Sequence, residues 1–214
     1  MDRKFRKRSS CLINLKKLIY LISPSKIYKS FYNDLEKVLM SQKIEFFQLR
    51  LKKIPKNQIV KIAKKIKKLT KKYKVKFLIN DNANLAKMIK ADGCHLGQLD
   101  GSIDEARKYL KGKIIGITCH NSKSLAKTAI KNKADYIAFG SFNKSYLKPN
   151  AKKADLQILK WAKKNIKKPI VAIGGINNSN YRKLIKAGAK YIAISSYIWD
   201  NPKLKPEFAI KKFK

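Results

Sequence analysis

The fold is decided by a stretch that reads INDNANLA at residues 79–86 and ADGCHLGQLD at residues 91–100. A short apolar run ends in a carboxylate, a helix-like segment follows, and a second apolar run ends near another carboxylate, which indicates a strand, a helix and a strand. If the two strands are parallel, the right-handed crossover places Asp81 and Asp100 at the same carboxyl-terminal edge of the sheet. The pair is then a candidate divalent-metal site for a phosphorylated substrate. The alternative is that one aspartate caps a helix and the other lies in a turn.

Apolar runs of the same kind recur along the whole chain, separated by segments with helical periodicity. The runs cover residues 18–23, 45–50, 76–80, 93–97, 113–119, 136–140, 170–175 and 191–198. The helical segments cover residues 31–41, 58–73, 103–110, 122–131, 156–165 and 179–187, and the tail from Pro202 predicts one more short helix. Strands rich in Ile and Val that alternate with helices indicate a parallel sheet buried on both faces. We therefore predict an α/β fold, a single (β/α)8 TIM barrel.

The predicted barrel is one domain, residues 18–214, after a basic lead at residues 1–17 that we expect to be loose. An open doubly wound sheet is the alternative, but the chain lacks the G-x-G-x-x-G turn after its first strand. Ser30 and Ser102 stand just before helical segments and are expected N-caps. A barrel of this kind carries its chemistry on the loops after the strands.

The charge of the chain is strongly positive. Lys and Arg together number 52 against 13 Asp and Glu, a formal net charge of +39 at pH 7. The basic residues are mostly Lys, spread along every predicted helix, without the clustered arm or the aromatic interleaving of nucleic-acid-binding surfaces. We therefore favour a uniform compositional bias over a specific nucleic-acid site, although attraction to polyanions follows in either case. A basic nucleic-acid-binding protein remains the non-enzyme alternative.

Cysteine use and hydropathy bear on the compartment. Cys11, Cys94 and Cys119 form no C-x-x-C pair and no metal-ligand spacing, which favours free thiols in a reducing setting. The apolar run at residues 18–22 is too short for the core of a signal peptide, and no run in the chain is long enough for a transmembrane helix. We expect a cytoplasmic protein with no membrane partner.

Polar residues and glycines gather just after the predicted strands. They are Gln48, Arg50 and Lys52; Asn80 and Asp81; His95, Gln98 and Asp100; Thr118 and His120; Ser141, Ser145 and Lys148; Gly174 and Gly175; and Ser195 and Ser196. Alternation along an extended segment puts Gln48, Arg50 and Lys52 on one side, where the two cations suit phosphate. The Gly-Gly turn and the paired serines match the place where barrels build phosphate sites, although a tight turn would explain the glycines equally well.

The two histidines, His95 and His120, keep two interpretations each. A histidine at a strand end is about as often a hydrogen-bonded core residue as a catalyst. No acid is spaced to orient either ring, so a nucleophile–His–Asp triad has no support. Cys119 beside His120 could suggest a thiol nucleophile, but adjacent residues on a strand face opposite ways, and we discount it.

Taken together, these segments resemble the thiamine phosphate synthase family. The similarity runs from about Leu18 to Ile198 and rests on the motifs Gln48-x-Arg50-x-Lys52, Asn80-Asp81-x-x-x-Leu85-Ala86, Ala91-Asp92-Gly93-x-His95-Leu96-Gly97-Gln98-x-Asp100, Ala134-Asp135-Tyr136-x-x-x-Gly140, Ala172-Ile173-Gly174-Gly175-Ile176 and Ala193-x-x-Ser196. That family is a TIM barrel that joins a pyrimidine-methyl diphosphate to a thiazole phosphate, giving thiamine phosphate and diphosphate with Mg²⁺. The resemblance implies the same fold, cofactor and transferase activity here.

The resemblance also implies roles for individual residues. Asp81 and Asp100 would be Mg²⁺ ligands, and Thr118 would stand in place of the family's usual Ser. The expected catalytic residues are Arg50, Lys52, Thr118, His120 and Lys148, and the expected substrate-binding residues are Gln48, Asn80, Ser145, Gly175, Ser195 and Ser196. Cations around a departing diphosphate agree with the physical demands of breaking a C–O bond to it.

The loop after the sixth predicted strand departs from the family pattern. The family commonly reads G-P-I-F-P-T-x-T-K, whereas residues 140–148 read GSFNKSYLK, which keeps Lys148 and a hydroxyl at Ser145 but loses both prolines and the second Thr. Thiazole tautomerases, a sister group on the same barrel, use a His where His120 stands but tend to lack the paired metal carboxylates. Asp81 and Asp100 therefore favour the synthase over a tautomerase or a diverged paralogue. Small phosphorylated molecules are the expected partners, and a homo-oligomer is left open.

Overall fold

Eight parallel strands form a closed barrel. The computed structural model describes residues 17–143 and 153–214, and its strands follow one another round the barrel in chain order, each pair of neighbours parallel. The strands are β1 (Ile19–Ile22), β2 (Ile44–Leu49), β3 (Lys76–Asn80), β4 (Gly93–Leu96), β5 (Ile114–His120), β6 (Tyr136–Phe139), β7 (Ile170–Ile173) and β8 (Tyr191–Ile194). The prediction of a single TIM barrel is confirmed.

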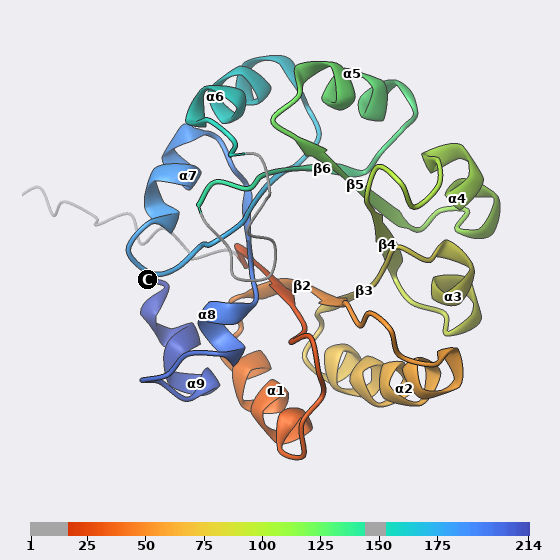
Figure 1. Ribbon diagram of the computed structural model, residues 1–214, viewed down its shortest axis with the longest axis vertical. Coiled ribbons are helices and arrows are strands. Elements are labelled where there is room, and N and C mark those ends of the chain that lie inside the picture. Colours follow the sequence, from red (N-terminus) through yellow and green to blue (C-terminus); the bar gives the residue numbers. More distant parts are fainter. Residues whose placement is uncertain (1–16, 144–152) are drawn as a thin grey trace, which may run out of the picture.

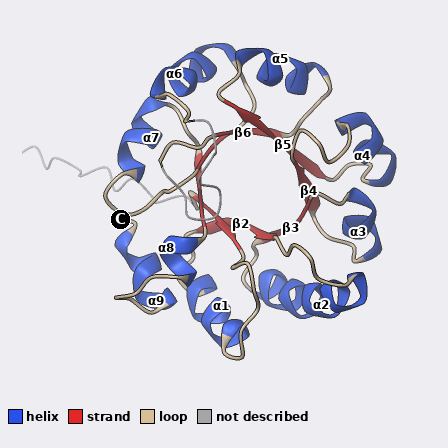
Figure 2. Ribbon diagram, in the orientation of Figure 1, coloured by secondary structure: helices blue, strands red, loops and turns tan. Residues whose placement is uncertain are grey.

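Helices surround the barrel on the outside (Figure 1). They are α1 (Phe31–Leu39), α2 (Lys56–Lys72), α3 (Ala83–Met88), α4 (Ile103–Tyr109), α5 (Lys123–Lys131), α6 (Leu156–Asn165), α7 (Tyr181–Ala187), α8 (Ser196–Trp199) and α9 (Pro206–Ala209), with a 3₁₀ turn η1 (Ile210–Lys212) near the end of the chain. Each longer helix buries one apolar stripe. In α2, Ala63 and Ile66 are buried while Lys64 and Lys68 are exposed, as a period of 3.6 residues requires. Figure 2 shows the resulting two rings, strands inside and helices outside.

Alternation along the strands divides the apolar residues into two cores. On β1, Ile19 and Leu21 belong to the large core between strands and helices, whereas Tyr20 and Ile22 belong to a smaller core. The smaller core fills the barrel and consists of Tyr20, Ile22, Phe46, Leu78, Tyr136, Ala138, Val171, Tyr191 and Ala193. Successive residues of a strand point to opposite faces, so the residue two places after each inward residue also points inward, one layer nearer the carboxyl end.

One expectation about element ends is wrong, and another is confirmed in position but not in its hydrogen bond. The strand expected at residues 191–198 ends at Ile194, and α8 begins at Ser196, because periodicity alone does not distinguish a buried strand from a short buried helix. Ser30 stands at the N-cap of α1, but its hydroxyl donates to Asp34 and accepts no backbone N–H. Ser102 does form the expected cap, a full capping box with Glu105. The predicted tail helix is confirmed as α9.

Some expectations fall on residues that the structure leaves undescribed. Residues 1–16 of the predicted basic lead are outside the described residues, and so are Ser145 and Lys148 of the loop after β6. Within residues 17–143 and 153–214, no helix combines the length and the apolarity that crossing a membrane requires.

Two aspartates hold the amino-terminal end of the barrel together. Asp135 precedes β6, and its carboxylate accepts hydrogen bonds from the backbone N–H of Ile115 at 2.8 Å and from Arg107 at 2.9 Å. Asp92 precedes β4 and accepts in the same way from the backbone N–H of Phe77 at 2.8 Å. Both aspartates lie in motifs that carry the family resemblance, but at the end of the barrel away from the loops after the strands. Their position indicates stability rather than chemistry.

We expect Asp135→Ala to lower the free energy of unfolding by about 1–3 kcal/mol, because the Ile115 N–H loses its partner in a partly buried place. Equilibrium unfolding in urea measures this change. Ligand binding at the opposite rim should be unaltered. A variant that unfolds at the wild-type urea concentration but has lost binding would place Asp135 in the functional site instead.

Candidate active site

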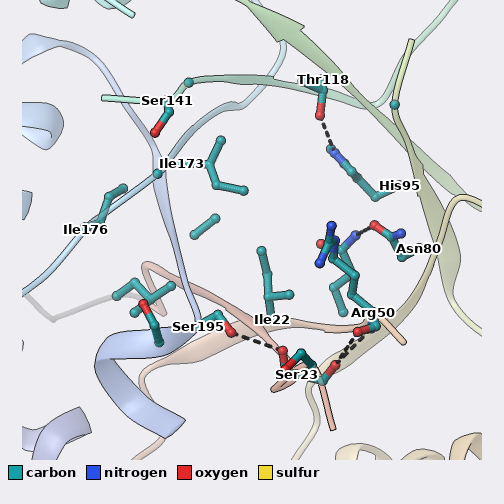
Figure 3. A pocket seen from close by; sticks show the side chains of 18 of the residues that line it. Ile22, Ser23, Arg50, Asn80, His95, Thr118, Ser141, Ile173, Ile176 and Ser195 are labelled. Carbon is teal, nitrogen blue, oxygen red and sulfur yellow. Dashed lines mark hydrogen bonds between the residues drawn. The ribbon is translucent and has the colours of Figure 1, made fainter. Parts of the chain in front are cut away.

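A cavity of about 750 Å³ opens at the carboxyl-terminal ends of the strands, and residues at or just after the end of every strand line it. Figure 3 shows it from close by. The expected site residues on its walls are Gln48, Arg50, Lys52, Asn80, Asp81, Asp100, Thr118, His120, Gly175, Ser195 and Ser196. All expected site residues that the structure describes therefore meet at one cavity. Gln98, another polar residue that follows β4, does not line this cavity. Its side chain donates a hydrogen bond to the carbonyl oxygen of Thr118.

Asp81 and Asp100 lie next to each other in the cavity, as the strand–helix–strand pattern predicts. Partial burial and the neighbouring carboxyl of Asp100 raise the pKa of Asp81 to about 6. The backbone of Asp81 has a φ of 63°, and its N–H donates to the carbonyl oxygen of His95 at 2.8 Å. Asp100 accepts a hydrogen bond from the N–H of Gly97 at 2.9 Å. The cap of α3 is Asn82 rather than Asp81, so the helix-cap alternative is wrong for Asp81.

Cationic side chains stand beside the carboxylates. The Nζ of Lys52 lies 3.9 Å from Asp81, and Arg50 is also close enough to lower the pKa of Asp81, although burial outweighs both cations. The Lys52 side chain is more than half exposed, so this ion pair contributes little to stability. Arg50 and Lys52 are therefore available to a negatively charged ligand.

A chain of hydrogen bonds runs through the barrel to the cavity. One ring nitrogen of His95, Nε2, shares a hydrogen bond with the Thr118 hydroxyl at 2.9 Å, and the other, Nδ1, shares one with the Tyr136 hydroxyl at 2.8 Å. The Tyr136 hydroxyl is in turn 2.8 Å from that of Tyr20. Burial raises the pKa of both tyrosines, so they stay neutral. Of the two interpretations of His95, the hydrogen-bonded interior residue fits these contacts.

On β2 and β3, the side chains that border the cavity are amides. The Gln48 side chain donates to the Asn80 side-chain oxygen at 2.6 Å, with Gln48 buried two residues after Phe46 of the inner core. This bond occupies the Asn80 side-chain oxygen, which Figure 3 shows turned toward Gln48, and Asn80 lines the cavity beside it. Amide and hydroxyl side chains therefore form the layer between the apolar inner core and the cavity.

His120 and Cys119 point to opposite sides of β5. His120 is exposed, lines the cavity and has a φ of 49°, whereas Cys119 is fully buried in the outer core. Burial raises the pKa of the Cys119 thiol to about 12. The alternation argument against a thiol nucleophile agrees with this placement.

The turn after β7 brings the backbone close to its neighbours. Gly174 and Gly175 have φ values of 103° and 56°, a region that favours glycine. A Cβ on Gly174 would lie 2.0 Å from the hydroxyl oxygen of Ser141. Asn180 donates a hydrogen bond to the carbonyl oxygen of Gly175 at 2.9 Å. A tight turn accounts for Gly174, and the same turn places Gly175 on the cavity wall.

Some cavity residues escaped the sequence analysis. Ser23 follows β1 and lines the cavity, and its place as the polar last residue of the first apolar run, residues 18–23, was a usable signal. Tyr20 and Tyr136 belong to the inner core rather than to the cavity wall, and their hydrogen bonds to each other and to His95 gave no signal, because an inward tyrosine on a strand has the pattern of an ordinary core residue.

Comparison with known proteins identifies the family. The family model described as thiamine monophosphate synthase matches residues 19–198. The chain belongs to this family. The match covers the whole barrel from β1 to α8, and the resemblance expected from the short motifs is confirmed.

Relatives in this family are similar over most of their length. A thiamine-phosphate synthase of Pelagibacter ubique is 57% identical over 200 residues, covering 93% of this chain and 97% of the relative. One of Erythrobacter litoralis is 40% identical over 186 residues, covering 85% and 87%. The solved thiamine phosphate pyrophosphorylase from Pyrococcus furiosus superposes with a TM-score of 0.82 at 28% identity, covering 93% of this chain and 95% of that one. The net charge of +39 had left a nucleic-acid-binding protein as the alternative to an enzyme, and these similarities support the enzyme.

We expect Cys94 and Cys119 to resist thiol reagents in the folded protein, because both are buried and burial raises the pKa of each thiol to about 12. The measurement is labelling at pH 8 in a Cys11→Ser background, with a urea-unfolded sample as the control in which both thiols react. Rapid labelling of one thiol in the native protein would contradict the placement of that residue.

Proposed function

We propose that the chain joins 4-amino-2-methyl-5-pyrimidinylmethyl diphosphate to a thiazole phosphate, forming thiamine phosphate and releasing diphosphate. The observation that carries the proposal is the cavity at the rim of the barrel, where paired carboxylates lie among cationic and amide side chains. A transfer from a diphosphate needs such a set, because negative charge develops on the departing group. Membership of the thiamine monophosphate synthase family supports this reaction over other uses of a phosphate-binding barrel.

Asp81 and Asp100 are the proposed ligands of Mg²⁺. Burial and then the neighbouring Asp100 carboxyl raise the pKa of Asp81, and a divalent cation between the two carboxylates would stabilise the ionised form of Asp81. In the described part of the chain, no cluster of three or more His, Cys, Asp or Glu side chains could hold a metal ion. Water and substrate oxygens would therefore complete the coordination, as is common for Mg²⁺. When bound, the ion supplies positive charge beside the departing diphosphate.

One half of the cavity is suited to the pyrimidine diphosphate. Its proposed contacts are Gln48, Arg50, Lys52, Asn80, Thr118 and Lys148. Arg50 offers a forked donor and Lys52 a point charge, and both stabilise the diphosphate as its charge grows. Asn80 keeps its N–H donors for the ligand, since Gln48 already occupies its oxygen. Lys148 enters on the family resemblance alone.

The other half is suited to the thiazole phosphate. Its proposed contacts are Gly175, Ser195 and Ser196, with Ser145 added by the resemblance. Gly175 has a positive φ and belongs to the turn after β7, while Ser195 and Ser196 follow β8. These neighbouring strands form the part of a barrel rim where backbone N–H groups commonly bind phosphate.

The proposed reaction requires groups that stabilise the charges formed when the C–O bond breaks, and it does not require a protein nucleophile. The C–O bond between the pyrimidine methylene and the diphosphate breaks, and its electron pair stays on the diphosphate oxygen. The lone pair of the thiazole nitrogen then forms the new C–N bond to the pyrimidine-methyl cation. Holding both substrates in one cavity makes the second step effectively intramolecular.

A thiazole tautomerase is the second candidate, because His120 lines the cavity at the end of β5. A histidine there is the feature that the resemblance associates with tautomerases. The synthase remains the better proposal, since Asp81 and Asp100 meet in the same cavity. We keep His120 among the proposed catalytic residues as a hydrogen-bonding group for a substrate.

The setting of the reaction is also proposed. The thiols of Cys94 and Cys119 are free and buried, which fits the cytoplasm, where thiols stay reduced. Small phosphorylated molecules are the proposed partners, and the oligomeric state is left open.

The first experiment is formation of thiamine phosphate from the two phosphorylated precursors by the purified protein. We expect product with Mg²⁺ and none with excess EDTA, and restored turnover when Mg²⁺ is added back. Product is measured by chromatography against authentic thiamine phosphate. Absence of product from a folded sample with Mg²⁺ would overturn the synthase and favour the tautomerase.

We expect Asp81→Asn to reduce turnover about a hundredfold or more and to raise the Mg²⁺ concentration needed for half-maximal rate. Asn tolerates the positive φ at this position, and loss of a charge that the folded state disfavours should leave the metal-free melting temperature unchanged or higher. Asp135→Asn, the same change at the opposite end of the barrel, is the control and should retain wild-type turnover. Equal losses in the two variants would argue against a metal-binding role for Asp81.

A further inference from the structure

Ser23 occupies the point where the two proposed halves of the cavity meet. It follows β1 directly, its exposure is 3%, and it lines the cavity. Pro24 comes next, and a residue before proline is restricted to an extended backbone. Ser23 is therefore held in one conformation, with its main chain and its side chain both available for contacts.

The side chain of Ser23 holds Arg50. The backbone N–H of Arg50 donates to the Ser23 hydroxyl oxygen at 2.9 Å, and the hydroxyl can donate to the carbonyl oxygen of Arg50 at 3.3 Å or of Pro24 at 3.2 Å. The paired residues of β1 and β2 end with Ile22 and Gln48. Ser23 thus continues the pairing with a side chain, at the residue that carries the guanidinium proposed for the diphosphate.

The main chain of Ser23 holds the end of β8. The Ser195 hydroxyl donates to the carbonyl oxygen of Ser23 at 3.1 Å, and the Trp199 indole N–H donates to that of Ile22 at 2.6 Å. Figure 3 shows Ser195, Ser23 and Arg50 joined in one row along the cavity wall. A hydroxyl has one hydrogen, so Ser195 cannot also donate it to a phosphate while this bond lasts.

We propose that Ser23 is a positioning residue that fixes the distance between Arg50 in the diphosphate half and Ser195 in the monophosphate half. It acts through these two residues and contacts neither substrate. The proposal rests on the proposed function for its choice of ligands. Such a residue matters because both substrates must reach bonding distance within one cavity, and a small misplacement of either anion separates the reacting atoms.

The test compares Ser23→Ala with Thr70→Val. Thr70 is also buried, and its hydroxyl donates to the carbonyl oxygen of Lys67 on α2, away from the cavity. Each substitution removes one buried hydroxyl and nearly preserves the shape of the side chain. Both should lower the free energy of unfolding, so a purely structural effect is common to the two variants.

We expect Ser23→Ala to raise the dissociation constant for inorganic pyrophosphate with Mg²⁺, measured by calorimetry, about five- to tenfold, because the Arg50 N–H loses its partner. The KM values for both substrates should rise similarly, while kcat at saturation falls less. Thr70→Val should leave all of these constants at wild-type values. Ser195→Ala, on the opposite half, should also weaken pyrophosphate binding, and its effect should not add fully to that of Ser23→Ala.

The possible outcomes separate this proposal from the proposed function. Wild-type pyrophosphate affinity and KM values in Ser23→Ala would overturn the positioning role even if the protein makes thiamine phosphate. Equal changes in Ser23→Ala and Thr70→Val would also overturn it. Pyrophosphate binding that depends on Ser23 in a protein without synthase turnover would support the positioning role and reject the proposed reaction.

Discussion

Closure of eight parallel strands into one barrel is the constraint on which the rest of the molecule depends. It brings every carboxyl-terminal strand end to one rim, and the period of two residues decides which side chains enter the barrel. On β2 and β3, the inward residues are apolar in the middle of the barrel, at Phe46 and Leu78, and amidic two residues later, at Gln48 and Asn80. On these two strands, the change from an apolar to an amide side chain therefore marks the boundary between the core and the cavity.

The same constraint explains which parts of the molecule could be predicted from the sequence. Alternating strands and helices determine the barrel, and one strand–helix–strand unit is enough to bring Asp81 and Asp100 together. Contacts between distant strands leave no local pattern. Nothing near Tyr136 in the sequence reveals that its hydroxyl meets His95, and nothing near Ser23 reveals Ser195. The start of α8 was missed for a related reason, because Ile198 and Trp199 are buried whether the segment is strand or helix.

The cavity contains a pair of carboxylates although the chain as a whole is strongly positive. A protein with a net charge of +39 attracts phosphorylated molecules without any special arrangement. The cavity nevertheless holds two carboxylates close together, and the raised pKa of Asp81 indicates that the folded state disfavours the charge of this residue. A local conflict of this kind is expected at a functional site, where binding of a cation resolves it. The carboxylates thus distinguish the site from the general anion attraction of the surface.

The connection between β6, which ends at Phe139, and α6, which begins at Leu156, contains residues 140–148, whose sequence departs from the family pattern. The described cavity residues lie mainly at strand ends and in short turns, whose positions barrel closure determines. The carboxylate pair and the contacts of Ser23 come from residues outside this connection. Loops tolerate variation when a rigid scaffold holds the reacting groups. The described strand ends accordingly hold the groups on which the proposed reaction depends.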